Sequence, residues 1–344
     1  MARISDVAKR AGVSPASVSR HMAGDKVGGA ERIAAAIKDL NYRPNQLARG
    51  LRSGRHSCVG VIVPDITNPL FAALVDGIES VFAADNIRVL LANSREDPLH
   101  EAALVADLVS RTDGLILIPP SETDPVLEQI ALARVPVVLV DRVLSTGPDV
   151  DFVIVDNRHG AQLAAEHLIS LGHREIAVIS GPLSSFPGRE RHEAFLQTLA
   201  DSGRPPRPAH VRLSDFRVEG GYAAMASLLA EEIPPTAVFC ANNLTSIGAL
   251  RLLRDRGVAI PDEVSLVGFD DLDLSELLNP PLTVIDRATF ALGSSAAELL
   301  RDRLATPDRE QQHLTLPVQL VVRGSTAEPA PRPLKHTHRS EKSS

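Results

Sequence analysis

Short apolar runs alternate with helical patterns along most of this chain. CVGVIVP at residues 58–64 precedes a helical pattern at residues 71–86, and IRVLLAN then returns as an apolar run. The alternation restarts after VIVDN at residues 153–157. Apolar strands joined by helices form parallel sheets that are covered on both faces. The sequence therefore predicts an α/β body with two lobes of parallel sheet.

Polar residues follow the ends of these predicted strands. Open α/β sheets bind ligands at the carboxyl ends of their strands, so residues directly after the apolar runs are candidates for a ligand site. Candidates of this kind are Asp65, Arg142, Asn242 and Asp270.

The first 56 residues differ from the body in charge. They hold 11 lysines and arginines but only 4 acidic residues, a net charge of +7, whereas the whole chain carries −7. The remainder therefore carries −14. This separation of charge predicts a nucleic-acid-binding head on an acidic body.

The stretch ISDVAKRAGVSPASVSR, residues 4–20, has the pattern of two short helices joined by a tight turn. Ser5 is expected to cap the first helix, and Gly12 ends it because glycine tolerates a positive φ. Ser14 is a favourable cap for a second helix at residues 15–21. The pattern predicts a helix-turn-helix, whose second helix enters the major groove. A third helix is expected at residues 30–40.

The segment YRPNQLARGLRSG, residues 42–54, has a leucine pair four residues apart and two weakening glycines. Two helical turns are unstable alone in water. We expect a hinge that is disordered in the free protein and helical on DNA, and a plain interdomain linker is the alternative.

Together, ISDVAKRAGVSPASVSR and NYRPNQLARGLRSG resemble the head of the lac repressor (LacI) family of bacterial transcription regulators, and the similarity continues to about residue 324. The resemblance implies an all-α helix-turn-helix head on a two-lobed body like a periplasmic binding protein. It implies a homodimer that binds a near-palindromic double-stranded DNA operator. The expected parts are a DNA-binding domain at 1–42, a hinge at 43–56, lobe 1 at 57–158 and 289–317, lobe 2 at 159–286 and 318–324, and a disordered tail at 325–344.

The resemblance also implies which residues contact DNA. Pro15, Ala16 and Arg20 match positions that read bases, although Pro15 could equally serve only to start its helix. In the hinge, Leu51 matches a wedge that enters the minor groove and bends the DNA. Ser14, Ser17 and Asn45 match phosphate contacts, and Ser5 and Ala48 complete the expected set. The segment at 25–30 is about three residues shorter than is common in the family, which leaves open whether this loop contacts phosphates and whether the head binds DNA more weakly.

Further positions in the body match ligand contacts of the family. Phe71 is expected to stack on the ligand, Arg191 to bind ligand oxygens, and Asp270 to accept hydrogen bonds from hydroxyl groups. Phe216 and Asn242 are weaker candidates of the same kind. We expect a small hydroxylated effector, a sugar or sugar derivative, and a purine or nucleoside is the alternative.

Other classes of protein have less support in the sequence. No phosphate-binding loop, metal-ligand cluster or nucleophile elbow occurs, so we expect no enzyme activity, no cofactor and no metal. With two distant cysteines and no signal peptide or membrane span, we expect a cytoplasmic protein. A solute-binding receptor without a DNA function has the same body, but the basic head argues against it.

Overall fold

The computed structural model describes residues 2–22, 24–42, 56–123, 126, 130, 135–145, 150–271 and 273–331. The chain forms two compact units that divide after Ser57. The predicted hinge contacts Asn45, Ala48 and Leu51 lie outside the described residues.

The described residues of the N-terminal unit form three helices: α1 (Ile4–Ala11), α2 (Pro15–Met22) and α3 (Ala30–Asp39). They share a small buried core that includes Val7, Val18 and Ile33. Gly12 has a φ of 66° and caps α1, and the Ser17 amide donates to Ser14 Oγ at 3.1 Å at the start of α2. The helix-turn-helix predicted from the sequence is therefore present.

The expected cap of the first helix was wrong. Ser5 lies inside α1, and Arg3 is the residue that precedes the helix. The Arg3 amide donates to Asp6 Oδ2 at 2.8 Å. An acidic residue three positions after the cap can satisfy the cap's own amide. The cap is therefore two residues earlier than expected.

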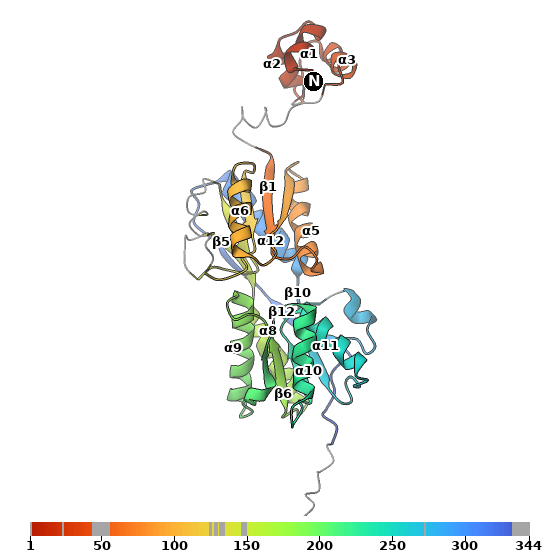
Figure 1. Cartoon of the computed structure of the whole chain (residues 1–344). Helices are drawn as coiled ribbons and strands as arrows, with labels where there is room; N and C mark the ends of the chain where they lie inside the picture. Colours follow the sequence, from red (N-terminus) through yellow and green to blue (C-terminus); the bar gives the residue numbers. More distant parts are fainter. Residues whose placement is uncertain are drawn as a thin grey trace, which may run out of the picture. The chain divides into compact units, whose positions relative to one another are not determined.

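Lobe 1 of the second unit is a six-stranded sheet in the order β11-β5-β4-β3-β1-β2, and all of its pairings are parallel. Helices α5 (Pro69–Ala83) and α12 (Thr289–Ala305) pack against each other, while α6 (Pro98–Val109) packs on β1 and β3 (Figure 1). The strands are β1 (Cys58–Val63), β2 (Arg88–Asn93), β3 (Gly114–Leu117), β4 (Val137–Val140), β5 (Asp151–Val155) and β11 (His313–Leu316).

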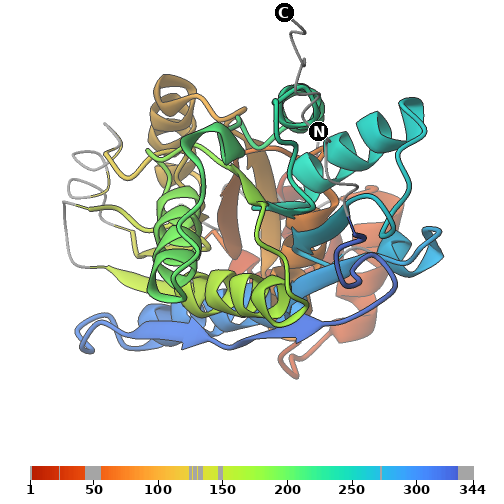
Figure 2. The ribbon, with the colours of Figure 1, turned by 90° about the horizontal axis from the view of Figure 1, so that it is seen from below.

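Lobe 2 repeats this design with the order β12-β10-β9-β8-β6-β7. Helices α8 (Asn157–Ser170) and α9 (Phe186–Asp201) pack together, as do α10 (Val218–Leu229) and α11 (Asn243–Asp255), and the two pairs cover opposite sides of the sheet (Figure 2). The strands are β6 (Ile176–Ser180), β7 (Val211–Leu213), β8 (Ala237–Cys240), β9 (Ser265–Phe269), β10 (Thr283–Arg287) and β12 (Val318–Val321), with short 3-10 turns at Pro208–His210 and Asp273–Leu277.

The chain passes between the lobes three times: from β5 to α8, from β10 to α12, and from β11 to β12. One pairing departs from the expected parallel sheets, because β12 runs antiparallel to β10. β12 follows β11 after the single residue Pro317 and has no helix before it, so the chain cannot make the crossover that a parallel neighbour requires.

Burial explains why the strand predictions were correct. All six residues of β1 are buried, as expected for a central strand covered on both faces. Cys58 and Cys240 are also buried, and burial raises the pKa of the Cys240 thiol to about 12. Both cysteines therefore serve as small apolar side chains.

The predicted disordered tail is wrong for its first residues. Ser325 is buried, and its hydroxyl donates to Leu266 O at 2.6 Å. His173 Nε2 donates to Ala327 O at 2.9 Å. The sequence is rich in proline and charge here, yet hydrogen bonds to lobe 2 hold the segment. Residues 332–344 lie outside the described residues. None of the helices that the structure describes is long and apolar enough to span a membrane.

Candidate functional site

A small cavity lies between the two lobes, at the carboxyl ends of their strands. All seven ligand residues predicted from the sequence line it: Asp65, Phe71, Arg142, Arg191, Phe216, Asn242 and Asp270. Its volume is about 40 Å³. The structure thus brings together residues that are up to 205 positions apart in the sequence.

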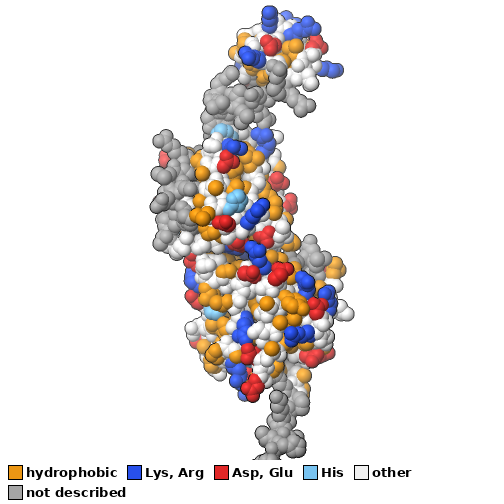
Figure 3. Space-filling view, in the orientation of Figure 1, with side chains coloured by type: hydrophobic (Ala, Val, Ile, Leu, Met, Phe, Trp, Pro, Cys, Tyr) orange, Lys and Arg blue, Asp and Glu red, His pale blue; other side chains and the backbone are white. Residues whose placement is uncertain are grey.

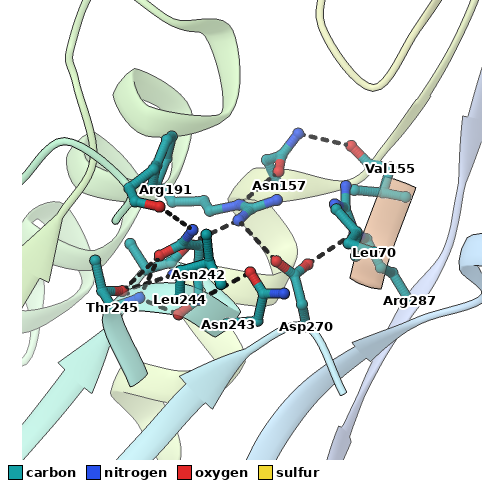
Figure 4. Close-up of polar contacts among 12 residues, drawn as sticks. Leu70, Val155, Asn157, Arg191, Asn242, Asn243, Leu244, Thr245, Asp270 and Arg287 are labelled. Atoms are coloured by element: carbon teal, nitrogen blue, oxygen red, sulfur yellow. Dashed lines mark hydrogen bonds and ion pairs between the residues drawn. The ribbon is translucent and has the colours of Figure 1, made fainter. Parts of the chain in front are cut away.

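Arg191, on α9, is held on several sides at this cavity (Figure 4). Its Nε donates to Asn157 Oδ1 and its Nη1 donates to the backbone oxygen of Ala241, both at 2.7 Å. Its guanidinium lies 3.5 Å from the ring centre of Phe269, and its Nη1 lies 4.0 Å from Asp270 Oδ2. Burial lowers the pKa of Arg191 to about 10, so the side chain remains charged at neutral pH.

Arg142 makes a two-pronged ion pair at the lobe 1 side of the cavity. Its Nη1 and Nη2 donate to the two carboxylate oxygens of Glu96 at 2.7 and 2.9 Å. Paired donors of this kind match the planar fork of a guanidinium and fix its orientation. The predicted Arg142 is therefore present at the cavity, but its charge is already matched by Glu96.

Asn242 also has a structural role that was not predicted from the sequence. Its side chain accepts a hydrogen bond from the Thr245 amide at 2.9 Å and so caps α11. Its Nδ2 donates to Phe216 O at 3.2 Å. These contacts position Asn242 at the cavity while occupying much of its hydrogen-bonding capacity.

Several charged residues of the cavity were not in the set of predicted contacts, among them Glu96 and Arg287. Arg287 donates to Asp141 Oδ1, and its Nε lies 2.7 Å from Asp270 Oδ1. Both missed residues end or follow a strand, so their position after a strand was the available signal.

The charges around the cavity nearly cancel. Four arginines and five carboxylates line it. Burial opposes ionisation of Asp141, but Arg287 and then Arg142 outweigh it, so the pKa of Asp141 lies below its usual value. The pKa of Arg287 is raised in spite of burial, because Asp141 and Asp270 stabilise its charge. The site therefore contains paired opposite charges rather than a large excess of one sign.

Several residues that line the cavity have strained backbone conformations. Glu96, Asp141, Phe216 and Asp270 all have φ between 57° and 73° and all line the cavity. Left-handed backbone is uncommon for residues other than glycine, and such strain clusters at binding sites where the surrounding structure enforces it.

One buried donor at the cavity, Arg142 Nε, has no hydrogen-bond partner among the described residues. Asp270 Oδ1 and Arg287 Nε, in contrast, lie 2.7 Å apart as an ion pair. An unmet buried donor is costly. A ligand hydroxyl both donates and accepts hydrogen bonds, so it can serve such a donor and can also contact a carboxylate.

The predicted DNA contacts of the helical unit lie on its surface. Ser5, Ser14, Pro15, Ala16 and Arg20 are exposed, and Ser17 is half-buried. Figure 3 shows basic side chains spread over this unit. Gly29, in the shortened segment at residues 25–30, precedes α3. Because glycine has no side chain, no side-chain hydrogen bond caps this helix. The exposed basic residues among the described part of this unit are Arg3, Lys9, Arg10, Arg20, Lys26, Arg32 and Lys38.

Known proteins match both units. Residues 3–45 match the family of bacterial regulatory proteins of the lacI family, and residues 165–326 match the periplasmic binding protein-like domain. The HTH-type transcriptional repressor PurR of Haemophilus influenzae (strain PittEE) is 32% identical over 338 residues, covering 94% of this chain and 98% of that protein. The chain belongs to the LacI family. The resemblance seen in the sequence is thereby confirmed.

Solved structures of the family agree with this assignment. The lac repressor dimer bound to operator and the anti-inducer ONPF is 30% identical, with a TM-score of 0.84 over 95% of this chain and 99% of that chain. The complex of the transcriptional regulator CelR with cellobiose is 32% identical, with a TM-score of 0.73 over 94% of this chain and 100% of that chain.

Proposed function

We propose that this LacI-family protein is a transcriptional repressor whose binding to a near-palindromic operator is controlled by a sugar or sugar derivative. The observation that carries the proposal is the combination of a helix-turn-helix unit with a two-lobed body whose interlobe cavity gathers all seven predicted ligand residues. As in the lac repressor dimer on its operator, two copies would each read one half-site.

The cavity favours an uncharged hydroxylated effector. Its arginines are paired with Glu96, Asp141 and Asp270, so a ligand with a strong net charge would have to disrupt an ion pair. Sugar hydroxyls can both donate to Asp270 and accept from arginine without bringing a charge. A cellobiose complex of a related regulator supports the same chemistry.

A purine effector is the second candidate, because a relative of 32% identity is named a PurR repressor. Phe71 and Phe216 line the cavity and offer apolar surface on which a flat base could stack. The effector acts on DNA binding only through its different affinities for two states of the protein, so its effect on the operator complex is measurable in either direction.

The test is a titration of the full-length protein bound to a fluorescent operator. A panel of pentoses, hexoses and disaccharides is added in parallel with purine bases and nucleosides, and fluorescence anisotropy follows the DNA. We expect one or more sugars, and no purine, to change the affinity about tenfold or more. A response to purines alone would replace the sugar assignment with the second candidate.

The Asp270→Asn variant tests the cavity itself. It keeps the size of the side chain but removes its charge, so we expect a weaker response to the effector. An unchanged response would remove Asp270 from the site.

A further inference from the structure

Arg287 connects the two lobes through a single side chain. It is the last residue of β10, from which the chain crosses out of the lobe 2 sheet towards α12 in lobe 1. Its guanidinium pairs with Asp141, which follows β4 of lobe 1, and with Asp270, which follows β9 of lobe 2. All three side chains are less than 5% exposed. Figure 4 shows Arg287 and Asp270 facing each other in this position.

These ion pairs occupy the place where an effector would bind. Arg287, Asp141 and Asp270 all line the interlobe cavity, whose volume is about 40 Å³. Such a space holds a few water molecules, whereas pockets for small ligands usually measure about 300–1,000 Å³. An effector therefore enters only if the lobes separate or the groups between them move.

The other contacts between the lobes are weaker or more exposed. Asn243 Nδ2 donates to Asn68 Oδ1 at 2.7 Å. At the rim, Arg189 pairs with Glu122, with 35% of the arginine side chain exposed. The Glu122 amide donates to Ser184 O at 3.0 Å. Removing one member of a buried ion pair leaves an uncompensated buried charge, so the pairs of Arg287 are the most costly of these contacts to break.

We propose that Arg287 is a built-in occupant of the effector site that holds the lobes together when no effector is present, and that an effector binds by replacing its contacts with Asp141 and Asp270. This inference rests on the proposed function for the identity of the site. Arg287 lies where the chain crosses from lobe 2 to lobe 1. Loss of its two ion pairs would therefore change the position of the end of β10 relative to lobe 1. The same residue would set specificity, since the incoming ligand must satisfy both carboxylates.

The closure part of the proposal is tested on the effector-free, full-length chain by hydrogen–deuterium exchange. The Glu122 amide is the reporter, because its hydrogen bond to Ser184 O joins the two lobes. The Arg287→Gln variant leaves two buried carboxylates facing each other without their shared counter-charge. We expect exchange at Glu122 to become about tenfold faster or more, and an unchanged rate would overturn the proposal.

Arg303→Gln is the matched control. Arg303 forms a two-pronged ion pair with the buried Asp151, at 2.9 and 3.0 Å, and both residues belong to lobe 1. This variant loses an arginine–aspartate pair without touching the contact between lobes, so exchange at Glu122 should match that of the unmodified protein. An equal acceleration in Arg303→Gln would show a general loss of stability and would contradict a specific role of Arg287.

Asp141→Asn provides a second variant in case Arg287→Gln does not fold. It removes only the lobe 1 partner and leaves the pair of Arg287 with Asp270 intact. We expect faster exchange at Glu122 here too, and an unchanged rate would count against the proposal. Since the measurement uses neither DNA nor effector, its outcome is independent of the operator titration described above.

Discussion

Asn68 and Asn243 exchange side-chain hydrogen bonds across the two lobes. Nδ2 of Asn243 donates to Oδ1 of Asn68 at 2.7 Å, and Nδ2 of Asn68 donates back at 3.4 Å. Each side-chain oxygen also accepts from a backbone amide of its own helix, that of Leu70 or of Leu244. The start of α5 and the start of α11 are therefore tied to each other as well as capped.

This pair predicts coupling between two single substitutions. Asn68→Ala and Asn243→Ala each remove the same interlobe contact, so the loss in the double variant should be smaller than the sum of the two single losses by about 1 kcal/mol. Urea unfolding of the four proteins measures the difference. Strictly additive losses would mean that the amides do not stabilise each other.

The Glu96→Gln substitution tests the ion pair beside the cavity. The Arg142 side chain is 6% exposed and Glu96 is its two-pronged partner, so the variant leaves a buried charge without compensation. We expect a loss of about 3 kcal/mol in the free energy of unfolding. Asp107→Asn, in the exposed pair with Arg111, is the control and should cost less than about 1 kcal/mol. Similar losses in both variants would contradict the importance of burial.

Gly293 allows α12 to pack closely on α5. A Cβ at this position would lie 2.0 Å from the backbone oxygen of Leu74, and one at Gly77 on the facing helix would lie 2.2 Å from that of Phe290. Backbone atoms cannot move aside as a flexible side chain does. We expect Gly293→Ala to lower stability by about 1–3 kcal/mol or more, while Ser294→Ala, next to it, has little effect. A stable Gly293→Ala variant with an unchanged melting temperature would rule out this contact.

His173 predicts a dependence of stability on pH. Its ring bonds to Thr236 Oγ1, Ser265 Oγ and Ala327 O, and burial is the main cause that lowers its pKa, with a smaller contribution from His167. The unfolded chain therefore binds a proton more readily than the folded one. Stability from this group is complete above the ordinary histidine pKa of about 6.5 and falls as the pH drops below it.

The measurement is the melting temperature between pH 8 and pH 5 in the unmodified protein and in His173→Gln. We expect the variant to show a smaller decrease with acidification. His100→Gln is the control, because this histidine is exposed on α6 of lobe 1. Parallel curves for the unmodified protein and His173→Gln would exclude His173 as the source.

Much of the fold could be predicted because the information is local. The fully apolar β1 and the glycine at the end of α1 each indicate structure within a few residues. The antiparallel β12 and the ordered residues 325–331 could not be predicted in this way. Their placement depends on partners far away in the sequence, such as β10 for β12 and His173 for Ala327.

The same limit applies to the cavity. A position after a strand, together with resemblance to the family, located all seven predicted residues. The role of Arg287 depends on Asp141, which is 146 positions away, and only the closed arrangement of the lobes brings the two together. The sequence therefore predicted residues that meet at one cavity, but not how the charges of this cavity pair.

The measurement that tests the central claim most directly is selection of genomic DNA fragments by the purified full-length protein at near-physiological salt. We predict recovery of a shared near-palindromic site whose affinity falls steeply as salt rises, because basic residues of the helical unit displace counterions. The Arg20→Ala variant should bind that site more weakly, by about 1–3 kcal/mol, if Arg20 reads a base. Equal affinity for the recovered fragments and for unrelated DNA, with and without the sugar panel, would contradict the account of an effector-controlled repressor.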